Sequence, residues 1–197
     1  MSNKELSISI LALTLGSALL AAVLFQGFTV VQAVVQQPPT QTMTPKPTPS
    51  PKPTVTADHT FMQAAAQGGQ AEVTMAKLAG QHAKDDRVKS YASTLDSDHT
   101  KANQELQELA GKKSLHLSTA PNATQRATQT RLEKLQGAAF DRAYVTEMVH
   151  DHQKDVAEFE RVAKTASDPD VKAYAEQTLP TLKAHLTQAL ELQKEIK

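Results

Sequence analysis

The chain has 197 residues, the length of one domain or of one domain with appendages. Its 21 basic and 21 acidic residues balance, which argues against a basic phosphate-binding face and therefore against nucleic acid as a partner. Because it contains no cysteine, disulfides, thiolate metal sites, cysteine nucleophiles and a lipoprotein anchor are excluded.

The N-terminal 37 residues contain a long apolar run. No charged residue lies between Glu5 and Lys46, and residues 6–25 are almost wholly apolar. About 20 apolar residues suffice to cross a bilayer as a helix, and a run of this kind is also typical of a long signal peptide. We therefore predict that residues 1–37 are either an uncleaved transmembrane anchor or a cleaved signal peptide. The protein is then periplasmic or otherwise extracytoplasmic, and the membrane is a partner if the leader stays attached.

A proline-rich linker follows at residues 38–57. Between Pro38 and Pro53 the sequence reads PPTQTMTPKPTPSPKP. Proline fixes φ and lacks a backbone donor, so this stretch is expected to be an extended spacer. A ligand for a proline-recognising domain is the alternative interpretation.

Residues 58–197 are rich in strong helix formers and divide into helices by their start and stop signals. Asp58 is a plausible N-cap for the first helix, Pro121 fits the first turn of a short helix, Gly137 interrupts the chain, and a kink is expected at Pro180. The predicted helices cover about 58–84, 86–111, 121–135, 138–166 and 168 to the C-terminus.

Two of these predicted helices open with related sequences. DDRVKSYA at 85–92 and DPDVKAYA at 168–175 share their first aspartate and the valine, lysine, tyrosine and final alanine. The same opening on the second helix of each pair indicates two related αα-hairpins, each too thin to bury its own apolar stripe. We predict an all-α fold, an antiparallel four-helix bundle with an extra short helix between the hairpins.

Each long predicted helix carries one ionisable side chain near the middle of its apolar stripe, when residues at spacings of three and four are followed. Burial of such groups is costly unless they satisfy one another or a ligand. Three imidazoles and one carboxylate form a plausible shell for a transition-metal ion such as iron, zinc or copper. The predicted metal ligands are Glu72, His99, His152 and His185.

Carboxylates close to these histidines in sequence are candidates for orienting the rings, because metal-bound histidines usually donate their other ring nitrogen to a carboxylate. The candidates are Asp96, Asp98, Glu147 and Asp151. Two alternatives stay open: a metal-free polar network that fixes helix register, and a small-molecule pocket.

Other polar and small residues are expected to be structural. His59, His82, His116 and His150 fall off the stripes and are interpreted as surface residues. Gly68 and Gly69 predict close helix approach or a local bulge. No nucleophile–base arrangement, nucleophile elbow or phosphate loop is visible, so a binding or structural module is favoured over an enzyme.

Several strings resemble the bacterial exported domain-of-unknown-function family 4142 over about residues 58–193. They are AAQGGQAE at 65–72, DHTKAN at 98–103, FDRAYV at 140–145, MVHDH at 148–152 and TLPTLKAH at 178–185. The resemblance implies a ferritin-like four-helix bundle in the periplasm or outer membrane, and no established activity.

The broader ferritin likeness is incomplete at the predicted centre. Di-iron bundles supply two lone glutamates and two Glu-x-x-His pairs, whereas Leu182 stands here where the carboxylate before His185 belongs, and His152 stands where a lone glutamate belongs. A mononuclear or histidine-rich site, or a site that has lost its metal, is expected instead of a di-iron oxidase. Protein partners and substrate are not indicated.

Overall fold

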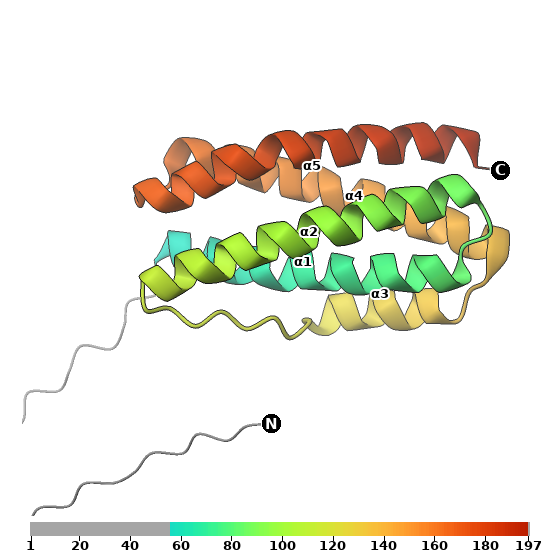
Figure 1. Ribbon diagram of the computed structural model, residues 1–197, viewed down its shortest axis with the longest axis horizontal. Coiled ribbons are helices and arrows are strands. Elements are labelled where there is room, and N and C mark those ends of the chain that lie inside the picture. The colour runs from blue at the N-terminus through green and yellow to red at the C-terminus, as the bar shows by residue number, and fades with distance from the viewer. Residues whose placement is uncertain (1–55, 197) are drawn as a thin grey trace, which may run out of the picture. The chain divides into compact units, whose positions relative to one another are not determined.

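A computed structural model describes residues 56–196, which form an all-α, antiparallel four-helix bundle with one additional short helix (Figure 1). The predicted leader and most of the predicted linker lie outside the described residues. Within 56–196 no helix is both long and apolar enough to cross a membrane. The helices are α1 (Ala57–His82), α2 (Asp86–Lys112), α3 (Ala123–Glu133), α4 (Gly137–Thr165) and α5 (Pro169–Glu195).

The bundle consists of two hairpins, α1 with α2 and α4 with α5, as the repeated sequence predicts. Contacts of α2 with α5 and of α1 with α4 close the bundle, and the short α3 packs on α1 and α4 (Figure 1). The helix α5 is continuous through Pro180, and α1 is continuous through its glycine pair, so no local bulge interrupts α1 there.

Side-chain caps decide where the helices begin. The aspartates of the repeat, Asp85 and Asp168, are the N-caps of α2 and α5. The prediction that Asp58 caps α1 is wrong. The hydroxyl of Thr56 accepts a hydrogen bond from the backbone N–H of His59 at 3.1 Å and caps the helix instead.

The start of α3 and the break before α4 have local causes. The prediction that α3 starts at Pro121 is also wrong, since Asn122 and Gln125 form a reciprocal capping box that begins the helix at Ala123. Gly137 does interrupt the chain, with a φ of +62° that glycine adopts without strain.

An approximate two-fold relation with an offset of 83 residues extends beyond the repeated octapeptides. Asp58 accepts the backbone N–H groups of Ser167 and Asp168 at 3.0 and 2.9 Å. At the equivalent position, Asp141 accepts those of Lys84 and Asp85, both at 3.0 Å. Each hairpin therefore holds the loop of the other from its own first turn.

The tyrosines of the repeat complete this relation. Tyr91 on α2 donates to the backbone carbonyl of His185 at 3.2 Å, and Tyr174 on α5 donates to that of Ala102 at 3.4 Å. Ala102 and His185 are themselves 83 residues apart. The tyrosines therefore fix α2 and α5 to each other at equivalent heights.

Asp141→Ala is expected to lower the free energy of unfolding by about 2–4 kcal/mol. Asp141 is only 2% exposed, and its removal leaves two backbone N–H groups without their acceptor in a buried place. Urea denaturation measures the change. Asp58→Ala is the matched comparison and should cost less, about 1 kcal/mol, because Asp58 is only half-buried. Equal losses for both variants would contradict this account of the loops.

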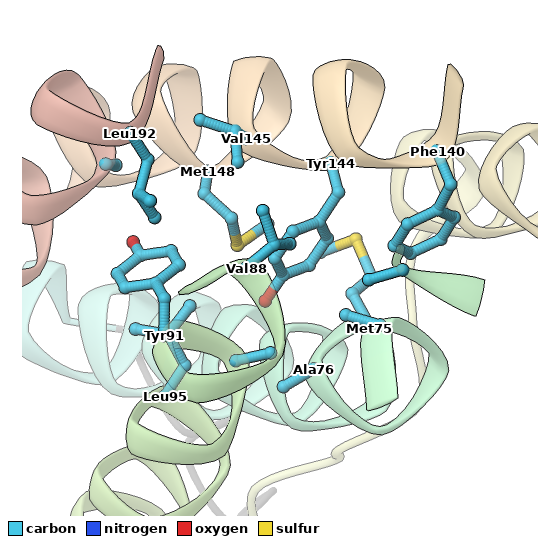
Figure 2. Close-up of a cluster of buried hydrophobic side chains, with 14 of the residues drawn as sticks. Met75, Ala76, Val88, Tyr91, Leu95, Phe140, Tyr144, Val145, Met148 and Leu192 are labelled. Atoms are coloured by element: carbon cyan, nitrogen blue, oxygen red, sulfur yellow. The ribbon is translucent and has the colours of Figure 1, made fainter. Parts of the chain in front are cut away.

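The hydrophobic core is divided into two clusters along the bundle axis. Figure 2 shows the cluster toward the α1–α2 turn, where Tyr91 and Tyr144 lie among Met75, Val88 and Met148. The other cluster surrounds Phe61 and Phe159, which meet edge to face. On each of the four long helices, the position predicted as ionisable falls in sequence between the two clusters. The polar side chains thus form a layer across the middle of the core.

Candidate metal centre

The four predicted ligands all lie in this polar layer, one from each long helix, and the three histidines converge. Their exposed fractions are 2% for Glu72, 6% for His99, 0% for His152 and 2% for His185. One ring nitrogen from each of the three histidines lies within 4.8 Å of the other two. The Glu72 carboxylate lies 3.2 Å from Nδ1 of His99 and 3.5 Å from Nδ1 of His152. Spacings of three and four residues place each of these groups on the inner face of its own helix.

Two of the rings are oriented by acceptors behind them. Nδ1 of His152 lies 2.9 Å from the backbone carbonyl of Met148, and Nε2 of His185 lies 2.9 Å from the Asp98 carboxylate. Because a carbonyl and a carboxylate only accept, these contacts assign the ring protons to Nδ1 of His152 and Nε2 of His185. This leaves Nε2 of His152 and Nδ1 of His185 as lone pairs, and they face each other at 3.4 Å.

Such a pair of facing lone pairs is unfavourable unless a positive charge lies between them. Two nitrogens bound to a tetrahedral ion at about 2.0–2.1 Å stand about 3.3–3.4 Å apart. The separation of the two inner nitrogens therefore matches one edge of a tetrahedral coordination shell.

Glu72 and His99 close the other side of the layer. Both Glu72 oxygens and Nε2 of His99 are buried without a hydrogen-bond partner among residues 56–196. The ring nitrogens near Glu72 are close enough for an ion pair, yet the contacts lack hydrogen-bond geometry. A buried carboxylate and ring nitrogen left in this state are costly, and both are metal-ligand atoms.

Burial dominates the protonation of these groups. It raises the pKa of Glu72 well above its usual range, helped by the charges of Asp155 and Asp151. Burial lowers the pKa of His99, and it lowers the pKa of His152 to about 4. The rings of His99 and His152 therefore stay neutral near pH 7, which is the form that binds metal.

Of the four carboxylates predicted to orient the rings, the structure places one against a histidine. Asp98 binds the ring of His185 on another helix. Glu147 is instead paired with Arg131 of α3, and Asp96 lies 3.9 Å from Lys77 near the surface. Among the described residues neither of these two carboxylates contacts a histidine ring, so the orienting role predicted for them is wrong.

The fourth carboxylate, Asp151, has no ring partner within the described chain and lines a cavity.

The histidines outside the predicted centre differ in exposure. His116 and His150 are exposed as expected. His59 and His82 are half-buried, so their interpretation as surface residues is correct only in part, and His82 contacts the Leu135 carbonyl at 2.7 Å.

A cavity of about 270 Å³ lies beside the polar layer, between α1, α2, α4, α5 and the start of α3. Glu72 and His99 form part of its wall, together with Asn103, Asp151 and Asp155. Periodicity did not single out Asn103 or Asp155, although Asp155 stands 83 residues after Glu72 and the repeat could have located it.

Close helix approach occurs at Gly69, where a Cβ would lie 2.3 Å from Oδ1 of Asn103. At Gly68 the space is open.

Asp155→Asn is expected to stabilise the chelator-treated protein at pH 8 by about 1–3 kcal/mol and to leave its stability at pH 4 nearly unchanged. Burial, then the charge of Asp151, raises the pKa of Asp155 to about 7, against about 3.9 in an unfolded chain. A carboxyl with a raised folded-state pKa contributes stability below its unfolded pKa and loses it as the pH rises to about 7. Urea unfolding at both pH values measures this, with the exposed Glu191→Gln as control. An equal effect at both pH values would contradict it.

A sequence profile of the family described as "Domain of unknown function (DUF4142)" matches residues 42–192. No functionally curated protein is detectably similar.

Three solved structures share the fold. One is a candidate secreted protein of DUF305 from Streptomyces coelicolor, with a TM-score of 0.62 at 16% identity over 70% of this chain and 91% of that one. The others are CopM in its Cu(I)-bound form, with a TM-score of 0.60 at 17% identity, and CopM in its Ag-bound form, with 0.59 at 18% identity. Each covers 70% of this chain and 96% of CopM.

Proposed function

The chain belongs to the family described as a domain of unknown function, DUF4142, and from its own site we propose that it is an extracytoplasmic metal-binding bundle. Glu72, His99, His152 and His185 bind one first-row transition-metal ion between the two halves of the core. The observation that carries this proposal is the 3.4 Å separation of Nε2 of His152 and Nδ1 of His185, two rings whose other nitrogens each lie against an acceptor.

Copper and zinc are the first ions to test. A shell of three imidazoles and one carboxylate suits both, and copper binds most tightly in the usual order of divalent ions. CopM, which shares the fold, is known in copper-bound and silver-bound forms. At 16–18% identity this likeness supports the choice of ions to test and carries no ligand across.

A bound ion also lowers the free-energy cost of burying an ionised carboxylate in the layer. Its positive charge favours the ionised form of Glu72, which burial alone disfavours. The hydrogen bonds of His152 to a carbonyl and of His185 to Asp98 hold the rings in the orientation that binding requires. The apolar clusters lie on either side of the ligands along the bundle axis.

The experiment is metal analysis of the purified protein after incubation with Cu(II) or Zn(II) and removal of excess ion. Wild type is expected to retain one ion per chain, whereas His99→Ala and His152→Ala retain little. His150→Ala, an exposed histidine two residues from His152, is the matched control and should retain one ion. Retention at background level by wild type would overturn the proposal.

A second function is favoured by one contact. The Asp98 carboxylate at 2.9 Å from His185 is placed to stabilise an imidazolium, which would then donate Nδ1–H to His152. In that case the layer is a metal-free polar network that fixes the helix register of an envelope interaction module. The same metal analysis separates the two functions.

A further inference from the structure

An ion that binds the polar layer needs a route to it, because all four ligands are buried. Glu72 and His99 line the cavity beside the layer, and the other two histidines are not among its wall residues in the described chain. The cavity therefore meets the centre on the side of Glu72 and His99.

The α4 wall of this cavity is a row of carboxylates. Spacings of four, four and three residues place them on one face of the helix. The row is Glu147, Asp151, Asp155 and Glu158. Lys154 is the one basic side chain in the wall, as far as the described residues show.

The two middle members of the row differ from the two ends. Glu147 is paired with Arg131 and Glu158 with Arg161, whereas Asp151 and Asp155 form no ion pair within residues 56–196. The two carboxyl groups without an ion pair therefore lie in the middle of the cavity wall. Carboxylates that line a low-dielectric cleft raise the local concentration of cations.

A second observation points to a ligand in the same cavity. Both oxygens of Glu72 and Nε2 of His99 belong to side chains that are more than nine-tenths buried, and they lack hydrogen-bond partners in the part of the chain that is described. Both residues face this cavity. Acceptor atoms are thus present at its inner end, and carboxylates are present along its wall.

The repeat adds a positional reason for singling out Asp155. It occupies on α4 the position that Glu72 occupies on α1, 83 residues earlier, and both residues line the cavity. The two helices thus present one carboxylate each from equivalent positions.

We propose that this cavity is a vestibule for metal cations, in which Asp155 and Asp151 bind the incoming ion transiently and pass it to Glu72 and then to the histidines. The proposal rests on the proposed function, because it assigns the route by which the ion reaches the same centre. Asp155 and Asp151 act on the rate of binding more than on the final affinity.

Stopped-flow mixing of the metal-free protein with Co(II), followed by its visible absorption, measures the association rate constant directly. Asp155→Asn is expected to lower this constant about tenfold at low ionic strength, with a smaller difference at high salt because the charge is screened. The dissociation rate constant should fall as well, so that the equilibrium affinity changes by less than about threefold. Glu191→Gln removes one exposed charge outside the cavity wall and should behave as wild type.

Three outcomes would overturn the vestibule. One is an unchanged association rate constant in Asp155→Asn. Another is an affinity loss that arises from faster dissociation alone, which would make Asp155 a ligand. The third is a wild-type protein that shows no Co(II) spectrum and also retains no Cu(II) or Zn(II), which would overturn the proposed function as well, whereas the first two leave that function intact. Asp151→Asn is the second variant to use if Asp155→Asn fails to fold.

Discussion

Saturating Zn(II) or Cu(II) is expected to raise the thermal unfolding midpoint of the wild-type protein by on the order of 10 °C. An ion that binds only the folded state adds about 4 kcal/mol at a thousandfold excess over its dissociation constant, and each kcal/mol corresponds to about 2–4 °C in a chain of this size. The stabilisation is large because the four ligands come from four helices, so the ion links every pair of them.

His152→Ala should abolish this shift. Its ring is fully buried between Glu72 and His185, so no other side chain can reach its place. The measurement is a thermal melt by circular dichroism, with and without metal, and His150→Ala should keep the wild-type shift. An identical shift in wild type and in His152→Ala would place the bound ion elsewhere on the protein.

Acid should reduce the metal-dependent shift of wild type. Metal binding requires an ionised Glu72, and because burial raises the pKa of this carboxyl well above its usual range, protons compete with the ion for its oxygens. The same melt at pH 5 and pH 7.5 is expected to show the smaller shift at pH 5. This comparison needs no variant and is independent of whether the substitutions perturb packing.

Replacing all four ligands by leucine should make the metal-free protein more stable, by about 1–4 kcal/mol. The free-energy cost of removing buried polar groups from water is offset only when every group in the network is well paired. Here both Glu72 oxygens and Nε2 of His99 have no hydrogen-bond partner among residues 56–196. Leucines would join the two apolar clusters into one continuous core.

The test is urea unfolding of the quadruple variant beside wild type, both treated with chelator. His185→Leu alone is the informative comparison, because it removes the partner of Asp98 and leaves the rest of the layer in place, so it should not stabilise. Misfolding or altered oligomerisation of the quadruple variant would instead indicate that the polar layer specifies helix register, as in the metal-free alternative. A folded and more stable variant that binds no metal would agree with a layer kept for binding.

Much of the architecture follows from local signals. Apolar residues at spacings of three and four defined the helices and their inward faces, and the repeated octapeptides indicated the hairpin pairing that the structure confirms. The family resemblance is likewise confirmed. Errors at helix starts, at Asp58 and Pro121, arose because several polar residues compete to cap and only the folded backbone shows which one reaches the free N–H groups.

By itself, the sequence determined which four ionisable residues occupy the inner faces, because helical periodicity needs no tertiary information. Only the tertiary structure decided that these residues stand at one height between two apolar clusters, that Asp98 rather than Asp96 or Glu147 holds a ring, and that a carboxylate-lined cavity adjoins the centre. The physical reason is that successive residues lie about 100° apart around a helix axis, so the sequence alone fixes which side of the helix a residue faces. The axial offset between two helices depends instead on the loops and on the packing of all side chains together. Contacts such as Asp141 with the α1–α2 loop set that offset across more than 50 residues of chain.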